Sequence, residues 1–202
     1  IKDYRKAIEA FDFASIIDER FSGAYIEKGK SYEKLKMYAK AIACYKETLQ
    51  LEDPSSYIYR RIGFCYENLK NPDKALKYYL KSVHEDPLMD ESWVAIADLH
   101  LRKNDFKKAL QFVNKALGID EYNPLYWRRF AIINKDLMYF EEAELGFRKA
   151  IEHGDTFLDT WLFWSDTLNL LNEYEQAIEK LLKARGMFND EYEIEYRLAG
   201  LY

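Results

Sequence analysis

The chain has 202 residues, enough for one large domain or two small ones, and its mixture of 49% apolar and 32% charged residues is that of a folded protein. Few glycines and prolines and seventeen tyrosines favour long helices and argue against loop-rich β structure. A formal net charge of −5 argues against a basic surface that would bind nucleic acid. The sequence has no stretch of eighteen uninterrupted apolar residues, so it predicts no transmembrane helix.

The first predicted element is an amphipathic helix around Ala7, in "YRKAIEAF". From this alanine the same pattern recurs every 34 residues without insertion. An aromatic residue usually stands three positions before the alanine, a large one four after it and a small one seven after it. The alanines are Ala7, Ala41, Ala75, Ala109, Ala143 and Ala177. The pattern predicts six equivalent helices, which we name second helices.

A further helix is predicted before each second helix from Ala41 onward, and we name these first helices. Each begins at an aromatic residue and has a small residue four positions later, where another helix can approach closely. The aromatic residues are Tyr25, Tyr59, Trp93, Trp127 and Trp161. The small residues are Gly29, Gly63, Ala97, Ala131 and Ser165. Turn signals separate the helices, as at Asn71-Pro72, which has the form of an N-cap followed by proline.

This helix–turn–helix unit closely resembles the tetratricopeptide repeat, whose motif is W-x2-L-G-x2-Y…A-x3-F…P. The motif is matched by Tyr59, Ile62, Gly63, Tyr66, Ala75, Tyr79 and Pro87, and again by Trp93, Ile96, Ala97, His100, Ala109, Val113 and Glu121. Lys28 departs from it, because an apolar residue is usual there, and most repeats lack the terminal proline. The resemblance implies an all-α fold, a right-handed α-solenoid of 34-residue repeats, with about five full repeats and a partial repeat at each end.

We expect residues 1–202 to form a single superhelical domain that is a fragment of a longer repeat array. The expected repeats are 1–21 (partial), 22–55, 56–89, 90–123, 124–157, 158–191 and 192–202 (partial). The chain opens at Ile1 and not at methionine, which leaves a removed signal peptide as an alternative to the expected cytoplasmic location.

No spacing of polar residues predicts an enzyme, a metal site or a cofactor. The three histidines, His84, His100 and His153, fall in different repeats, and no Cys-x2-Cys motif is present. His100 takes a position that is tyrosine in other repeats, which favours a packing role.

Two shorter features also have ordinary explanations. Gly29-Lys30-Ser31 resembles the end of a phosphate-binding loop, but Ala24 stands where that motif needs glycine, and Gly29 falls within a helix. Cys44 and Cys65 are expected to be buried thiols, with a single disulfide between them as the alternative.

The resemblance implies that first helices line a concave groove, in which members of the family usually bind peptides or partner helices. Its inward positions lie two before and one, five, eight and nine after the first-helix aromatic residue. One neighbour, Phe163, is added because it stands beside these positions, two after Trp161. The expected groove residues are Ile26, Lys30, Lys34, Tyr57, Arg60, Phe64, Glu67, Val94, Asp98, Leu101, Arg102, Arg128, Ile132, Lys135, Leu162, Phe163, Asp166 and Leu170. Every repeat keeps an apolar residue among them, which indicates an interaction surface, unless some of these side chains pack against a neighbouring repeat.

The segment "WLFWSD", residues 161–166, divides between core and groove. Trp161 and Trp164 take recurring core positions, whereas Leu162 and Phe163 are apolar at positions that the repeat pattern does not bury. Two doublets, Arg60-Arg61 and Arg128-Arg129, occupy equivalent places two repeats apart. They are candidates to bind acidic residues of a partner, with pairing to nearby carboxylates as the alternative. The lysine and asparagine pattern with which chaperone adaptors of this family hold a terminal carboxylate is absent.

The expected function is therefore a protein-interaction module that binds a peptide or a partner helix, with no catalysis, no cofactor and no nucleic acid. One alternative is a scaffold that assembles by stacking of its open solenoid ends, including a homo-oligomer formed in this way. Another is a regulatory repeat region of a larger multidomain protein.

Overall fold

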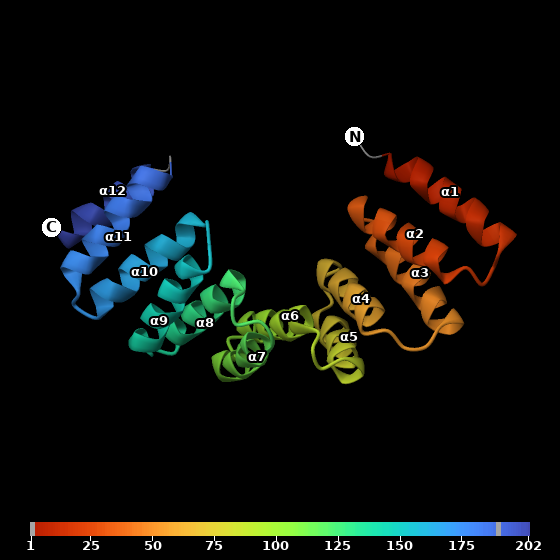
Figure 1. Ribbon diagram of the computed structural model, residues 1–202, viewed down its shortest axis with the longest axis horizontal. Coiled ribbons are helices and arrows are strands. Elements are labelled where there is room, and N and C mark those ends of the chain that lie inside the picture. The colour runs from red at the N-terminus through yellow and green to blue at the C-terminus, as the bar shows by residue number, and fades with distance from the viewer. Residues whose placement is uncertain (1–2, 189–190) are drawn as a thin grey trace. The chain divides into compact units, whose positions relative to one another are not determined.

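The computed structural model describes residues 3–188 and 191–202. All regular elements in these residues are α-helices, which confirms the all-α class (Figure 1). They are α1 (Tyr4–Ile17), α2 (Ser22–Lys34), α3 (Tyr38–Leu51), α4 (Ser56–Asn68), α5 (Pro72–Glu85), α6 (Asp90–Leu101), α7 (Phe106–Ile119), α8 (Pro124–Asp136), α9 (Phe140–Glu152), α10 (Leu158–Leu170), α11 (Tyr174–Met187) and α12 (Glu191–Leu201). The chain divides into two compact units, the first ending at Leu99 and the second starting at His100.

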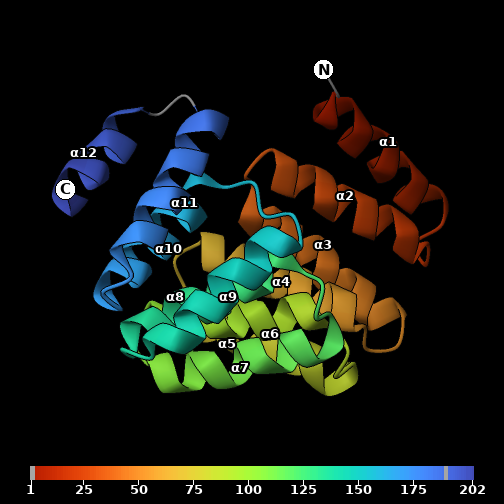
Figure 2. The same ribbon diagram turned by 60° about the vertical axis from the view of Figure 1, so that its left-hand side comes forward.

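Unit 1 is built from helices that pack in chain order, and its closest pairs are α4 against α5 and α2 against α3, the second of which is seen in Figure 2. Side chains cap several helices: Asn71 Oδ1 accepts a hydrogen bond from the Lys74 amide at 3.1 Å, and Pro72 takes the first helical position, as the sequence predicts. Tyr45, Ile58 and Ile62 are buried in its core.

Unit 2 repeats this arrangement with α8 against α9 and α10 against α11. Its core cluster gathers Phe147 and Leu168 with both Trp161 and Trp164, so the two tryptophans are core residues as predicted. Among the residues that the structure describes, no helix combines the length and the hydropathy needed to cross a membrane.

The 34-residue period appears directly in the backbone. Within the described ranges, five residues other than glycine adopt a left-handed conformation, each just after a first helix, with φ between 57° and 63°. They are Lys36, Lys70, Asn104, Met138 and Asn172, each 34 residues from the next. The same turn therefore joins the first helix to the second in each of these repeats.

The small positions of the first helices exist because large side chains pack onto them. A Cβ added to Gly29 would lie 2.6 Å from the Tyr45 ring, and one added to Gly63 would lie 2.7 Å from the Tyr79 ring. Only glycine lets these rings lie directly on the backbone of the facing helix. The small residues thus set the distance between the two helices of a repeat.

The structure also accounts for Lys28 and for the two cysteines. Lys28, charged where an apolar residue is usual, forms an ion pair with Asp12 of α1, and its side chain is only 18% exposed. Burial disfavours its charge, but the hydrogen bond to Asp12 and the attraction of Asp12 and other nearby groups together raise the pKa of Lys28. Cys44 and Cys65 are buried free thiols, which confirms the expectation of packing cysteines.

Candidate functional site

The expected groove residues lie on first helices but differ in accessibility. Lys34, Phe64, Arg102 and Leu170 are exposed, and Val94 and Leu162 are buried. The remaining members of the set are half-buried: Ile26, Lys30, Tyr57, Arg60, Glu67, Asp98, Leu101, Arg128, Ile132, Lys135, Phe163 and Asp166. In each unit the structure brings a few of them into direct contact.

In unit 1, two cations lie close to one aromatic ring. The Lys30 Nζ atom lies 5.6 Å from the centroid of the Tyr57 ring, and the Arg60 guanidinium carbon lies 5.5 Å from the same centroid. We name Lys30, Tyr57 and Arg60 the Tyr57 cluster. Lys30 also pairs with Glu27 at 2.7 Å, and the hydrogen bond to this carboxylate raises the pKa of Lys30. The cluster therefore holds two positive charges beside an aromatic face.

Arg60 has unused hydrogen-bonding capacity. Its Nε atom is buried and has no acceptor among the described residues. One turn further along α4, the Phe64 side chain is 39% exposed. Arginine donates up to five hydrogen bonds in a planar fork that matches a carboxylate. The arrangement can therefore receive an acidic group next to an apolar one.

The neighbouring Arg61 is engaged within the fold. Its Nε donates to Glu33 Oε1 at 3.0 Å, and its terminal nitrogen pairs with the second oxygen of the same buried carboxylate. Tyr45 Oη also donates to Glu33, at 2.7 Å. Burial disfavours the charge of Arg61, but Glu33 together with the nearby tyrosines Tyr45 and Tyr57 favours it, so the pKa of Arg61 is raised. Of this doublet, only Arg60 remains a candidate for a partner.

Glu67 follows the same rule as Glu33. Both stand eight positions after a first-helix aromatic residue, and Glu67 accepts a hydrogen bond from Tyr79 at 2.8 Å, as Glu33 does from Tyr45. This part of the expected groove therefore carries a structural contact between the helices of one repeat.

In unit 2, Arg128 is also engaged within the fold. Its guanidinium lies 3.4 Å from the buried Asp155 carboxylate and 4.1 Å from the Phe157 ring centroid. Asp155 additionally accepts hydrogen bonds from the Phe157 amide at 2.9 Å and from the Thr160 hydroxyl at 3.0 Å. Arg128 thus secures the turn before α10, so the two doublets are not equivalent.

Leu162 and Phe163 owe their apolar character to packing. Leu162 is 4% exposed and belongs to the core cluster of unit 2, where Phe163 packs partly buried against the same cluster. The Phe163 ring lies 6.5 Å from Phe147, centroid to centroid, and Lys135 Nζ lies 4.7 Å from its centroid. The fold therefore does explain both side chains, contrary to the interpretation of "WLFWSD" from the sequence.

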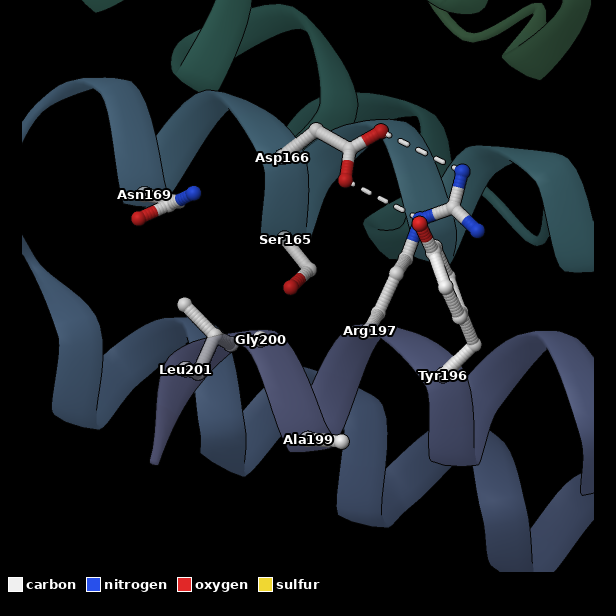
Figure 3. Close-up of a pocket in the computed structure, with 8 residues that line it drawn as sticks. All are labelled: Ser165, Asp166, Asn169, Tyr196, Arg197, Ala199, Gly200 and Leu201. Atoms are coloured by element: carbon white, nitrogen blue, oxygen red, sulfur yellow. Dashed lines mark hydrogen bonds and ion pairs between the residues drawn. The ribbon is translucent and has the colours of Figure 1, made fainter.

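Asp166 lines a cavity of about 410 Å³ between α10 and α12 (Figure 3). It binds Arg197 through Nε at 3.0 Å and through a terminal nitrogen at 3.4 Å. Gly200 stands at the position that bears Phe64 in α4 and Ile132 in α8, and no atom lies within 4 Å of where its Cβ would be. The missing side chain leaves this space open. The signal for it was glycine at a position where the other repeats carry Lys30, Phe64, Asp98, Ile132 and Asp166, and sequence reasoning missed that signal.

The histidine that replaces a repeat tyrosine packs as that tyrosine would. The His100 ring stacks on Phe112 at 5.4 Å between centroids, and its Nδ1 lies 3.4 Å from Asp105. Within the described part of the chain, no three or more His, Cys, Asp or Glu side chains are grouped to hold a metal ion.

Two segments of the chain match models of one protein family. Models of the tetratricopeptide repeat match residues 22–54 and 66–124. No curated protein matches the chain.

Solved structures share the fold at low sequence identity. The PilF structure from Pseudomonas aeruginosa has a TM-score of 0.83 at 14% identity, covering 98% of this chain and 90% of that one. PilW, described as a type IV pilus biogenesis factor, has a TM-score of 0.79 at 19% identity, with 98% and 91% covered. YrrB, described as a TPR protein with an unusual peptide-binding site, has a TM-score of 0.76 at 18% identity, with 95% and 99% covered. These likenesses establish a fold of stacked helical repeats.

Proposed function

Because the chain belongs to the tetratricopeptide repeat family, we propose that it is a protein-interaction module whose first helices α2 and α4 bind a peptide or a partner helix at the Tyr57 cluster. In this proposal it has no catalysis of its own. The observation that carries the proposal is Arg60, whose Nε has no acceptor among the described residues although the atom is buried. The peptide-binding site named for YrrB supports the general class of function.

The chemistry of the cluster favours a partner segment with a carboxylate beside an apolar side chain. Lys30 and Arg60 supply positive charge beside Tyr57, and Lys34 is exposed one turn after Lys30. Phe64 offers an exposed aromatic surface next to them. Charge complementarity of this kind sets the orientation and specificity of a bound segment more than its affinity.

Affinity capture with three forms of the chain tests this function. We expect the unaltered chain and a Lys46→Glu control, changed at an exposed position of α3, to recover the same proteins. The double variant Arg60→Glu/Phe64→Glu should lose them. Leu162 is unsuitable for such a variant because it is buried in the core. Recovery of the same proteins by all three forms would remove the Tyr57 cluster as the binding site.

A second candidate function, assembly of copies through their ends, is favoured by two open repeat positions. Ala199, at the small position of α12, is exposed, whereas Gly29, Gly63, Ala97, Ala131 and Ser165 at the equivalent position are buried. Ala7 of α1 is half-buried, whereas the other recurring alanines are 0% exposed. Light scattering at high concentration tests this candidate, since a strict monomer contradicts it.

A further inference from the structure

The second helix α1 differs from the other second helices in what it exposes. Phe13 and Ile16 are 69% and 75% exposed, and Ile17 and Phe21, which follow on the helix and the next turn, are also exposed. We name these four residues the α1 patch. Large side chains that expose this much apolar surface mark interaction sites when they are contiguous and have a polar rim.

The positions of Phe13 and Ile16 are also accessible in the other second helices. Phe13 stands six residues after the recurring alanine, where the other repeats have Glu47, Lys81, Lys115, Lys149 and Lys183. Ile16 stands nine after it, where they have Gln50, His84, Gly118, Glu152 and Gly186. All of these residues are exposed except Lys149, which is half-buried. Helices with neighbours on both sides in the chain leave these positions open, so packing within the solenoid does not require Phe13 and Ile16.

The rim of the α1 patch is mainly acidic. Glu9 lies one turn before Phe13, and Asp18 and Glu19 directly follow the helix, with Arg20 as the basic residue of this turn. Asp18 Oδ1 accepts a hydrogen bond from the Arg20 amide at 2.9 Å, and Glu9, Asp18 and Glu19 are all exposed.

We propose that the α1 patch is a docking site for an amphipathic helix of a partner protein that carries aliphatic or aromatic residues on one face and lysine or arginine beside them. The apolar face would cover Phe13 and Ile16, and the basic residues would meet Glu9 and Glu19. This site lies on a second helix, while the Tyr57 cluster lies on first helices, so the proposal does not depend on the proposed function.

A peptide titration of the whole chain tests the proposal. One probe is a synthetic amphipathic peptide of leucine and lysine, and the other is its counterpart of leucine and glutamate. Binding is measured from the changes in the amide NMR shifts of the chain. The test variant Phe13→Lys/Ile16→Gln introduces residues that other second helices carry at these positions, so it should fold normally. Leu182→Lys, an exposed leucine of α11, is the matched control.

We expect the lysine peptide to shift the amides of α1 and to bind Phe13→Lys/Ile16→Gln at least about tenfold more weakly than the unaltered chain or Leu182→Lys. The glutamate peptide should bind about tenfold more weakly than the lysine peptide. Equal binding to all forms, or shifts centred on other helices, would overturn the proposal. Light scattering that shows a dimer abolished by Phe13→Lys/Ile16→Gln would also overturn it, because the occupant would then be a second copy.

Discussion

Four equivalent positions of the repeat are filled differently in the two units. They are Gly29, Glu33, Tyr45 and Arg61 in unit 1, and Ala131, Lys135, Phe147 and Phe163 in unit 2. In unit 1 these positions join consecutive first helices through the Glu33–Arg61 ion pair. In unit 2 they do so through the Lys135 ammonium, which lies 4.7 Å from the Phe163 ring centroid. The repeat thus determines which positions meet, while the residues there determine how strongly and how specifically they interact.

Within each repeat the size and the polarity of the large side chain are linked to its neighbours. The Tyr45 ring lies where a Cβ of residue 29 would be, and its hydroxyl needs the Glu33 carboxylate. Phe147 has no hydroxyl, and the residue at the position of Glu33 is Lys135, which accepts no hydrogen bond. There Gly146 provides room on the second helix, because its Cβ would lie 2.9 Å from that of Ala131.

The largest effect should come from removing one member of the ion pair of unit 1. Arg61→Ala leaves the Glu33 charge buried without its partner, and we expect the free energy of unfolding to fall by about 3 kcal/mol. Urea denaturation measures this loss. Arg60→Ala, which removes the neighbouring arginine but no ion pair, is the control and should cost less than about 1 kcal/mol. Equal losses would mean that the pair contributes nothing specific.

Adding a methyl group between the helices of unit 1 should have the next largest effect. Gly29→Ala forces the Tyr45 ring to move and should lower the free energy of unfolding by about 1–3 kcal/mol. Gly118→Ala is the matched change in unit 2, since nothing lies within 4 Å of its Cβ, and it should raise stability by about 0.5–1 kcal/mol. Thermal unfolding of both variants distinguishes them by the sign of the change.

Alkaline pH should weaken the polar core of unit 1 selectively. Burial raises the pKa of the Cys65 thiol, with the Glu33 carboxylate adding to the shift. The folded chain then keeps a proton that the unfolded chain releases above about pH 8.5, so the contribution is present below that pH and is lost as the pH rises. Between pH 7.5 and about pH 9.5, the stability of Cys65→Ala should fall less than that of the unaltered chain by roughly 1 kcal/mol. Cys44 is buried in both forms, so the difference between them reports on Cys65 alone. Equal losses of stability in the two forms would contradict the assignment of the effect to the Cys65 thiol.

The smallest effect is expected at the cation of unit 2. Lys135→Gln removes the charge above the half-buried Phe163 ring and should cost about 0.5–1 kcal/mol, less than Arg61→Ala in unit 1. Lys107→Gln, at an exposed position of α7, is the control for loss of surface charge and should be nearly neutral. A loss at Lys135 as large as that at Arg61 would remove the contrast between the two units.

The sequence predicts the periodic part of this molecule well. The 34-residue period, the two kinds of helix, the cap at Asn71 and the core roles of Trp161 and Trp164 follow from patterns within one repeat. It predicts the surface less well, because burial there depends on the residues of the next repeat. Leu162 and Tyr196 stand at the same repeat position, yet their side chains are 4% and 69% exposed. Spacing alone did not identify Glu33 as the partner of Arg61, since the choice among nearby carboxylates depends on helix packing.

The five left-handed turns at Lys36, Lys70, Asn104, Met138 and Asn172 also bear on how such a chain can change during evolution. A segment cut at any two of them begins and ends in the same backbone conformation. Duplication or deletion of 34 residues between two such turns therefore joins like to like and leaves the flanking helices in their original register. The molecule can gain or lose whole repeats by recombination without a change in the turns that connect the helices. Each inserted copy can then diverge at the surfaces that meet a partner.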